Sequence, residues 1–134
     1  VGQVAPQQRA RKHELLVRRM VEIIEGHYRD ANLSLQTIAN RLKMSPTYLG
    51  RLFKARHHLS AVEYINKLRL HKAKEMLLAE DRSINEIMER VGYANKSYFF
   101  RLFKREFGTT PKDYRLKQSE AVHADRDGGR NLEA

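Results

Sequence analysis

The fold is decided by residues 87–115, which read IMERVGYANKSYFFRLFKREFGTTPKDYR. Apolar residues recur at helical spacing up to Val91, stop over the Gly-Tyr-Ala-Asn segment at 92–95, and resume over residues 96–107. Gly108 then supplies a residue that tolerates a positive φ at the end of a helix. The stretch therefore predicts a short helix, a tight turn and a longer helix, which together form a helix-turn-helix unit.

The same arrangement occurs earlier in the chain, so the sequence contains an internal repeat. Residues of the short helix recur at an interval of 49, namely Ser34, Ile38, Arg41 and Leu42, matched by Ser83, Ile87, Arg90 and Val91. Later residues recur at an interval of 50, namely Arg51, Leu52, Phe53, Lys54 and Tyr64, matched by Arg101, Leu102, Phe103, Lys104 and Tyr114. Because the interval grows by one between the two sets, the second copy has one extra residue in its turn.

Helix starts in both copies are marked by side chains that can accept hydrogen bonds from first-turn amides. Ser34 and Ser83 precede the short helices, and Ser45 precedes Pro46, a residue that suits the first helical position. A Thr-Pro pair at 110–111 gives the same signal before a last short helix, PKDYRLKQ.

The segment between the copies predicts one long helix that serves two cores. Its apolar residues, at about 100° per residue, fall on two faces. One face holds Ala61, Tyr64, Ile65 and Leu68, and the other holds Leu70, Ala73 and Leu77. We expect one set to pack in each lobe.

These elements predict an all-α fold in which two helix-turn-helix lobes are joined by a long bridging helix. An amphipathic helix over residues 12–28 completes the first lobe. The predicted limits are a flexible arm at 1–11, a double helix-turn-helix domain at 12–118 and a disordered tail at 119–134. Within the domain, lobe one spans 12–59, the bridging helix spans 60–80 and lobe two spans 83–118.

The basic residues are concentrated in the part of the chain that holds the repeat. The formal net charge is +10, and residues 34–117 contain 18 Lys and Arg against 8 Asp and Glu, so this part carries the whole excess. A basic folded core predicts phosphate as its counter-charge, and hence a nucleic acid as its partner.

Each long helix of the repeat has an apolar face and an opposite face that is basic in both copies. The apolar faces, which we expect to pack, hold Tyr48, Leu49, Leu52 and Phe53, and Phe99, Leu102 and Phe103. The opposite faces hold Thr47, Gly50, Arg51 and Lys54, and Lys96, Ser97, Phe100, Arg101 and Lys104. A face that only meets solvent has no need to be basic in both copies, so these faces are candidates for DNA contact.

Over about residues 15–117 the sequence resembles the DNA-binding region of the AraC/XylS family of bacterial transcription regulators. The resemblance is carried by YLGRLFK at 48–54, YINKLRLHKAKEMLL at 64–78 and above all the stretch at 87–115. It implies seven helices in two homeodomain-like lobes, each placing its second helix (residues 46–57 and 96–107) in the major groove of double-stranded DNA.

The resemblance also implies roles for individual residues. Base contacts would come from Pro46, Thr47, Gly50, Arg51, Lys96, Ser97, Phe100 and Arg101. Phosphate contacts would come from Ser34, Lys54, Ser83, Lys104 and Arg105, with backbone N–H groups at the helix starts contributing. Arg51 and Arg101 are the strongest candidates, because a guanidinium can donate two hydrogen bonds to O6 and N7 of guanine.

Three positions depart from the family pattern. Gly50 has no side chain where a polar reader is common, so the first lobe is expected to specify fewer bases. Phe100 stands where a smaller or polar residue is commoner, and it would either contact a thymine methyl group or be packed by a partner. His58 occupies the place of Gly108, so a non-glycine residue must end that helix.

The bridging helix predicts the form of the DNA site. About 20 residues at about 1.5 Å each give roughly 30 Å, close to the roughly 34 Å repeat of B-DNA. We expect an asymmetric site of about two helical turns rather than a palindrome. The resemblance further implies transcription activation through RNA polymerase. It also implies a separate sensing or dimerisation domain, which we expect to be missing from a chain that begins without Met.

The sequence leaves two other classes of function open. An enzyme is weakly supported, because the six histidines show no HExxH or other ligand spacing and there is no glycine-rich phosphate loop; we predict no enzyme activity, metal or cofactor. A non-specific nucleic-acid or anionic-surface binding module is the alternative to a specific regulator. The chain has no cysteine and no apolar run of the roughly 20 residues that cross a bilayer, which predicts a cytoplasmic, nucleoid-associated protein.

Overall fold

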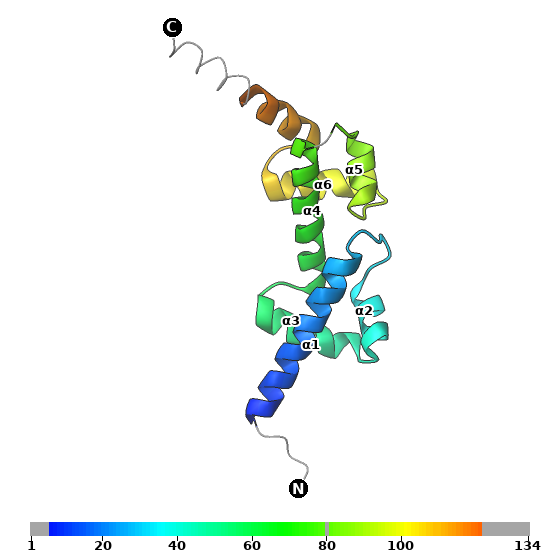
Figure 1. Cartoon of the computed structure of the whole chain (residues 1–134), viewed down its shortest axis with the longest axis vertical. Coiled ribbons are helices and arrows are strands. Elements are labelled where there is room, and N and C mark those ends of the chain that lie inside the picture. The colour runs from blue at the N-terminus through cyan, green and yellow to red at the C-terminus, as the bar shows by residue number, and fades with distance from the viewer. Residues whose placement is uncertain (1–5, 80, 122–134) are drawn as a thin grey trace. The chain divides into compact units, whose positions relative to one another are not determined.

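The computed structural model of the chain describes residues 6–79 and 81–121 (Figure 1). Within these ranges the chain is all-α, as predicted, and contains no strand. It divides after Arg69 into two compact units, the first and the second lobe. The division falls inside one helix, so both lobes use that helix.

The first lobe consists of α1 (Pro6–His27), α2 (Leu35–Leu42), α3 (Pro46–His57) and the first half of α4 (Ala61–Ala79). Its core takes buried apolar residues from all of them: Val17, Met20, Ile24, Ile38, Ala39, Leu49, Phe53, Ala61 and Ile65. Each large side chain buried in this way contributes about 1.5–3 kcal/mol. The pair α2–α3 is therefore held by α1 and α4 as well as by its own contacts.

The second lobe consists of the second half of α4, α5 (Ile84–Arg90), α6 (Lys96–Phe107) and a helix over residues 111–121. Its core is Leu70, Ala73, Leu77, Ile87, Met88, Val91, Tyr93, Phe99 and Phe103. The buried residues of α1 and of the second half of α4 have the same spacing, Val17-Met20-Ile24 and Leu70-Ala73-Leu77. The second half of α4 thus takes the place that α1 has in the first lobe.

The bridging helix has the two apolar faces that the sequence predicts. Ala61 and Ile65 lie in the first core, and Leu70, Ala73 and Leu77 lie in the second. Each apolar face extends over only half of α4, so each half of the helix packs into a different core.

The pattern of buried and exposed residues repeats between the two lobes as closely as the sequence does. Each residue from 47 to 64 is buried, half-buried or exposed in the same way as the residue 50 places later, from 97 to 114. The two recognition helices, α3 and α6, therefore present equivalent faces to solvent.

Two predicted boundaries are wrong. α1 begins at Pro6, so the arm predicted at 1–11 is helical from that residue on. Residues 6–12 are all exposed and show no apolar period, but Pro suits the first helical position and Gln, Arg and Ala are good helix formers. The last helix runs to residue 121 instead of ending near 118. The rest of the predicted arm and tail lies outside the described residues.

Candidate nucleic-acid interface

The outer face of α3 carries residues that were predicted to contact DNA. Thr47, Arg51 and Lys54 are exposed, whereas Leu49 and Phe53 are fully buried. The helical period produces this division, since residues three and four places apart share a face. This face of α3 therefore presents one hydroxyl group and two cations to solvent.

The outer face of α6 is equivalent to that of α3 and carries more charge. Its exposed polar side chains are Lys96, Ser97, Arg101, Lys104 and Arg105. Two of these cations, Lys96 and Arg105, stand where α3 has Pro46 and Ala55. The outer face of α6 thus has two more cations than that of α3. Over the whole helices the difference is one, because α3 has Arg56 where α6 has Glu106.

Two cations of α6 lie over aromatic rings. The guanidinium carbon Cζ of Arg101 is 5.4 Å from the ring centroid of Tyr98, and Nζ of Lys96 is 5.4 Å from that of Phe100. An exposed cation–π contact is worth about 0.5–1 kcal/mol. Such a contact holds the side chain near one position but is weak enough to be exchanged for a hydrogen bond to DNA.

Gly50 and Phe100 both lie against packed side chains of their own lobes. A Cβ atom built on Gly50 would lie 3.2 Å from Cδ2 of Leu35 in α2, so the missing side chain lets α2 and α3 approach closely. Phe100 is half-buried against the second core, and its ring centroid is 5.9 Å from that of Phe99. Both predicted base-contacting positions therefore have a packing role.

The short helices α2 and α5 end in the same way, at the turns that lead to α3 and α6. Lys43 and Gly92 have positive φ values of 56° and 106°. The next amide donates back to the helix in each case, from Met44 to the carbonyl of Ala39 at 3.1 Å and from Tyr93 to the carbonyl of Met88 at 3.0 Å.

The extra residue of the second turn is Ala94, because the following N-caps, Ser45 and Asn95, are again equivalent. The side chain of Ser45 accepts from the amide of Tyr48 at 3.4 Å, and that of Asn95 accepts from the amide of Tyr98 at 2.8 Å. The role of Asn95 was missed in the sequence, although Asn is among the strongest N-cap residues and stood just before the helical pattern.

The far ends of the two recognition helices confirm the expectation for His58. This residue adopts φ 60°, the left-handed conformation that Gly108 adopts with φ 77°. Their amides donate to the carbonyls of Lys54 and Lys104 at 2.8 and 2.7 Å. His58 therefore ends α3 with the same hydrogen bond, in a conformation that costs a non-glycine residue about 1–2 kcal/mol.

The predicted N-caps of the short helices are confirmed. Oγ of Ser34 accepts from the amide of Thr37 at 3.1 Å, while Oγ1 of Thr37 accepts from the amide of Ser34 at 2.9 Å. Oγ of Ser83 accepts from the amide of Glu86 at 3.1 Å. Because each cap uses the amide of the third residue, the first two amides of these helices still point out of the helix end.

Two polar side chains of α4 support the first lobe behind α3. Arg69, only 7% exposed, donates to the backbone carbonyls of Tyr28 and Asp30 at 2.8 Å each. The Tyr64 ring packs 5.3 Å from that of Phe53. Burial, and secondarily the negative charge of Glu25, raises the pKa of the Tyr64 phenol. These contacts fix the loop after α1 and the inner side of the recognition helix.

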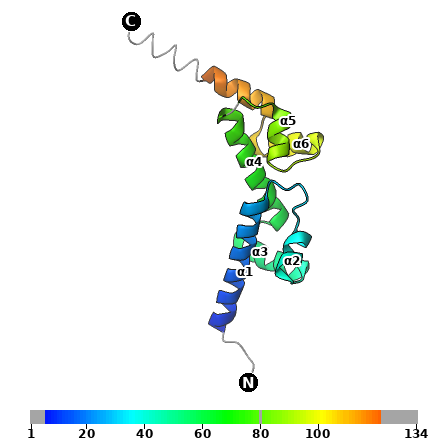
Figure 2. The same cartoon turned by 45° about the vertical axis from the view of Figure 1, so that its right-hand side comes forward.

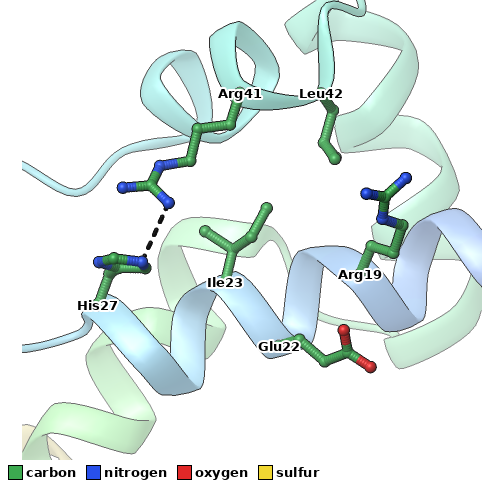
Figure 3. A pocket seen from close by; sticks show the side chains of 6 residues that line it. All are labelled: Arg19, Glu22, Ile23, His27, Arg41 and Leu42. Carbon is green, nitrogen blue, oxygen red and sulfur yellow. Dashed lines mark hydrogen bonds between the residues drawn. The ribbon is translucent and has the colours of Figure 1, made fainter.

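An open pocket of about 460 Å³ lies between α1 and α2 (Figure 3). It is lined by Arg19, Glu22, Ile23, His27, Arg41 and Leu42. Nη1 of Arg41 lies 3.0 Å from Nε2 of His27, and a guanidinium can only donate in such a contact. The lining residues are distinct from those predicted to contact DNA.

The described residues contain no group of three His, Asp or Glu side chains that could hold a metal ion. No helix within 6–79 or 81–121 is both long enough and apolar enough to span a membrane.

The fold and its two basic helix faces define a double helix-turn-helix domain of the DNA-binding class. The family described as "Helix-turn-helix domain" matches residues 38–117, which include both α3 and α6. The chain belongs to the AraC/XylS family of helix-turn-helix transcription regulators.

Two relatives illustrate the proteins in which this domain occurs. The chain is 35% identical over 103 residues to the regulatory protein SoxS of Salmonella typhimurium, a match that covers 77% of this chain and 95% of SoxS. It is 37% identical over 109 residues to YesN, an uncharacterized transcriptional regulatory protein of Bacillus subtilis, a match that covers 79% of this chain and 30% of YesN. The chain therefore spans almost all of one relative and less than a third of the other.

Two solved structures share the fold. The C-terminal domain of AraT, a response regulator from Geobacillus stearothermophilus, superposes with a TM-score of 0.74 at 38% identity, over 76% of this chain and 84% of that domain. The DNA-binding domain of AdpA, solved in complex with a target DNA, gives 0.70 at 24% identity over 83% of this chain and 96% of that domain. The family and the match to SoxS favour specific DNA binding over a non-specific anionic-surface module.

Proposed function

We propose that the chain is the DNA-reading part of a transcription regulator and that it places α3 and α6 in successive major-groove segments of an asymmetric site. The observation that carries the proposal is the matching of the two exposed faces, with Arg51 equivalent to Arg101 and Lys54 equivalent to Lys104. Two basic faces with the same pattern of burial suit two half-sites on one duplex, and the side chains that differ between the faces suit half-sites of different sequence.

The proposed contacts fall into two kinds. Arg51 and Arg101 each bind a guanine with two hydrogen bonds, which discriminates against other bases by about 1–3 kcal/mol. Further base contacts come from Pro46, Thr47, Lys96 and Ser97, while Gly50 and Phe100 shape the surface that meets the base edges. Phosphates are bound by Ser34, Lys54, Ser83, Lys104 and Arg105, which set the register without reading sequence.

The proposal extends to the protein from which this chain comes. The chain covers only 30% of YesN, which supports a sensing or dimerisation domain in a longer protein. We propose that this protein acts on the nucleoid in the cytoplasm and activates transcription through contact with RNA polymerase, as the family resemblance implies.

Selection of bound sequences from random duplex DNA tests the proposal. We expect an asymmetric motif of two different half-sites whose centres are about 10 base pairs apart. Affinity for the selected duplex should fall with salt, with a slope of about −0.9 per neutralised phosphate in a plot of log affinity against log salt. Lys54→Gln should lower that slope by about 0.9. The control Lys67→Gln, which changes an exposed lysine of α4, should leave it unchanged.

The competing function makes a different prediction for the same measurements. A non-specific module would bind single-stranded RNA, anionic vesicles and unrelated duplexes as tightly as any selected sequence. Such equality, or the absence of a common motif, would contradict specific DNA reading.

A further inference from the structure

The first turns of α1 form a basic surface that the contacts proposed above do not use. Between Pro6 and His13 the chain has Arg9, Arg11 and Lys12 and no acidic residue. Residues 6–12 are helical and exposed, and the buried residues that α1 adds to the first core begin only at Val17. These turns therefore add charge without adding to the core.

Two contacts place these turns against the recognition helix α3. The ring of His13 stands edge-on to that of Tyr48 with centroids 6.1 Å apart, and Oε1 of Glu14 lies 3.9 Å from Nη2 of Arg56. His13 thus marks the side of α1 that meets the N-terminal part of α3, and Glu14 marks the side that meets its C-terminal part.

The basic turns consequently begin close to the proposed reading face. Tyr48 directly follows Thr47, an exposed residue proposed to contact bases. Both views show the first turns of α1, in dark blue, running on past α3 (Figures 1 and 2). DNA held by the N-terminal part of α3 would therefore pass near this end of α1.

The basic residues of α1 lie on different sides of the helix. Relative to His13, Arg9 lies about 40° and Lys12 about 100° around the axis, both in the direction away from Glu14. Arg11 lies about 160° from His13 on the far side of the helix, and Arg18 lies near it at about 140°. Arg9 and Lys12 are therefore on the side of the N-terminal part of α3, and Arg11 and Arg18 are not.

We propose that Arg9 and Lys12 bind backbone phosphates in the DNA that flanks the half-site of the first lobe, so that α1 makes a third contact with the duplex. The inference rests on the proposed function, because the position of the flank depends on α3 binding in the groove. Phosphate contacts by long basic side chains add affinity and register but carry no base preference. They would supplement the outer face of α3, which has two fewer cations than that of α6.

The test uses the selected site in three duplexes and the full chain. One duplex ends at the outer edge of the first half-site, one is extended by about 10 base pairs beyond it, and one is extended equally beyond the second half-site. Affinities are measured by fluorescence anisotropy over a salt series. The test variant is Arg9→Gln with Lys12→Gln, and the control, Arg11→Gln with Arg18→Gln, removes the same charge from the same helix.

The wild-type chain should bind the duplex extended at the first half-site most tightly. The Arg9/Lys12 variant should lose that advantage, with binding weaker by roughly ten-fold near 0.1 M salt and a salt slope smaller by about 1.8. The Arg11/Arg18 control should keep both the advantage and the slope. Far-UV circular dichroism should show both variants folded, since all four side chains are exposed.

Two results would overturn the flank contact while leaving the proposed function intact. One is equal affinity of the wild-type chain for all three duplexes. The other is the same loss of affinity in both double variants. In either case the base preference on the shortest duplex would be unchanged. If the wild-type chain itself shows no base preference, the proposed function fails and the flank contact fails with it.

Discussion

The two lobes share one pattern of burial but differ in the side chains that produce it. In the second lobe the Phe103 ring lies 4.7, 5.9 and 6.0 Å from those of Phe107, Phe99 and Tyr114. In the first lobe the equivalent Phe53 ring lies 4.6 Å from His57 and 5.3 Å from Tyr64. Equivalent positions must be buried for the lobe to form, but different aromatic side chains can occupy them.

The same contrast holds at the helix ends and on the outer faces. The second lobe has Gly108 where the first has His58, and the outer face of α6 has Lys96 and Arg105 where that of α3 has Pro46 and Ala55. The recognition helix of the second lobe therefore ends in a residue better suited to a positive φ, and its outer face carries more positive charge than that of α3. We propose that the second lobe reads more bases than the first, in which Arg51 reads its half-site and the other contacts chiefly add affinity and register.

The largest expected effect on stability lies in the cores of the two lobes. Phe53→Ala and Phe103→Ala should each lower the free energy of unfolding by about 3–5 kcal/mol through the cavity left behind. Phe103→Ala should cost about 0.5–1.5 kcal/mol more, because more aromatic pairs are lost. Urea denaturation measures both values, and equal losses would contradict a role for the ring cluster. Amide exchange should show the effect concentrated in the lobe of the substitution.

The helix ends should respond in opposite directions. Gly108→Ala should destabilise by about 1–2 kcal/mol, the cost of a left-handed non-glycine residue, since no neighbouring atom lies within 4 Å of the added Cβ. His58→Gly should stabilise by about 0.5–1 kcal/mol by relieving the same strain. Thermal unfolding of the matched pair tests this, and a loss of stability in His58→Gly would show that its side chain has another role.

The caps of the recognition helices should differ in strength. Asn95→Ala should destabilise by about 1 kcal/mol, because its short bond to the Tyr98 amide is lost. Ser45→Ala should cost about 0.5 kcal/mol, because its bond is long at 3.4 Å and Pro46 still holds the first helical position. If the two losses proved equal in chemical denaturation, the hydrogen-bond lengths would not explain cap strength here.

The smallest effect is expected at Gly50. An alanine is favoured in a helix by about 1 kcal/mol, but its Cβ would lie 3.2 Å from Cδ2 of Leu35, which must shift. We expect Gly50→Ala to change the free energy of unfolding by less than about 0.5 kcal/mol. A loss above about 2 kcal/mol would mean that α2 and α3 cannot adjust at their contact.

Much of the fold could be read from the sequence because it depends on local periods. The repeat, the serine caps and the two apolar faces of α4 are patterns of near neighbours, and the structure confirms them. The start of α1 was missed because residues 6–12 bury nothing and show no period. Arg69 was missed because its partners, Tyr28 and Asp30, lie about 40 residues away in the chain.

Only part of the interface could be predicted from the helical period. Helical period alone places Thr47, Arg51 and Lys54 on the outer face of α3. It does not show that Phe100 packs partly inward or that Gly50 faces Leu35, because these depend on how closely the preceding helix approaches. Roles in DNA contact stay predictions for all of these residues.

The central claim is that each lobe reads its own half of one asymmetric site, and selection with single-lobe variants tests it most directly. Random duplexes are selected in parallel with wild type, Arg51→Ala and Arg101→Ala. We predict that each variant loses about 10- to 100-fold in affinity for the wild-type site. Each should relax base preference in one half-site only, and the two variants should affect different halves. Uniform weakening on all sequences, with the motif unchanged in both variants, would contradict the claim.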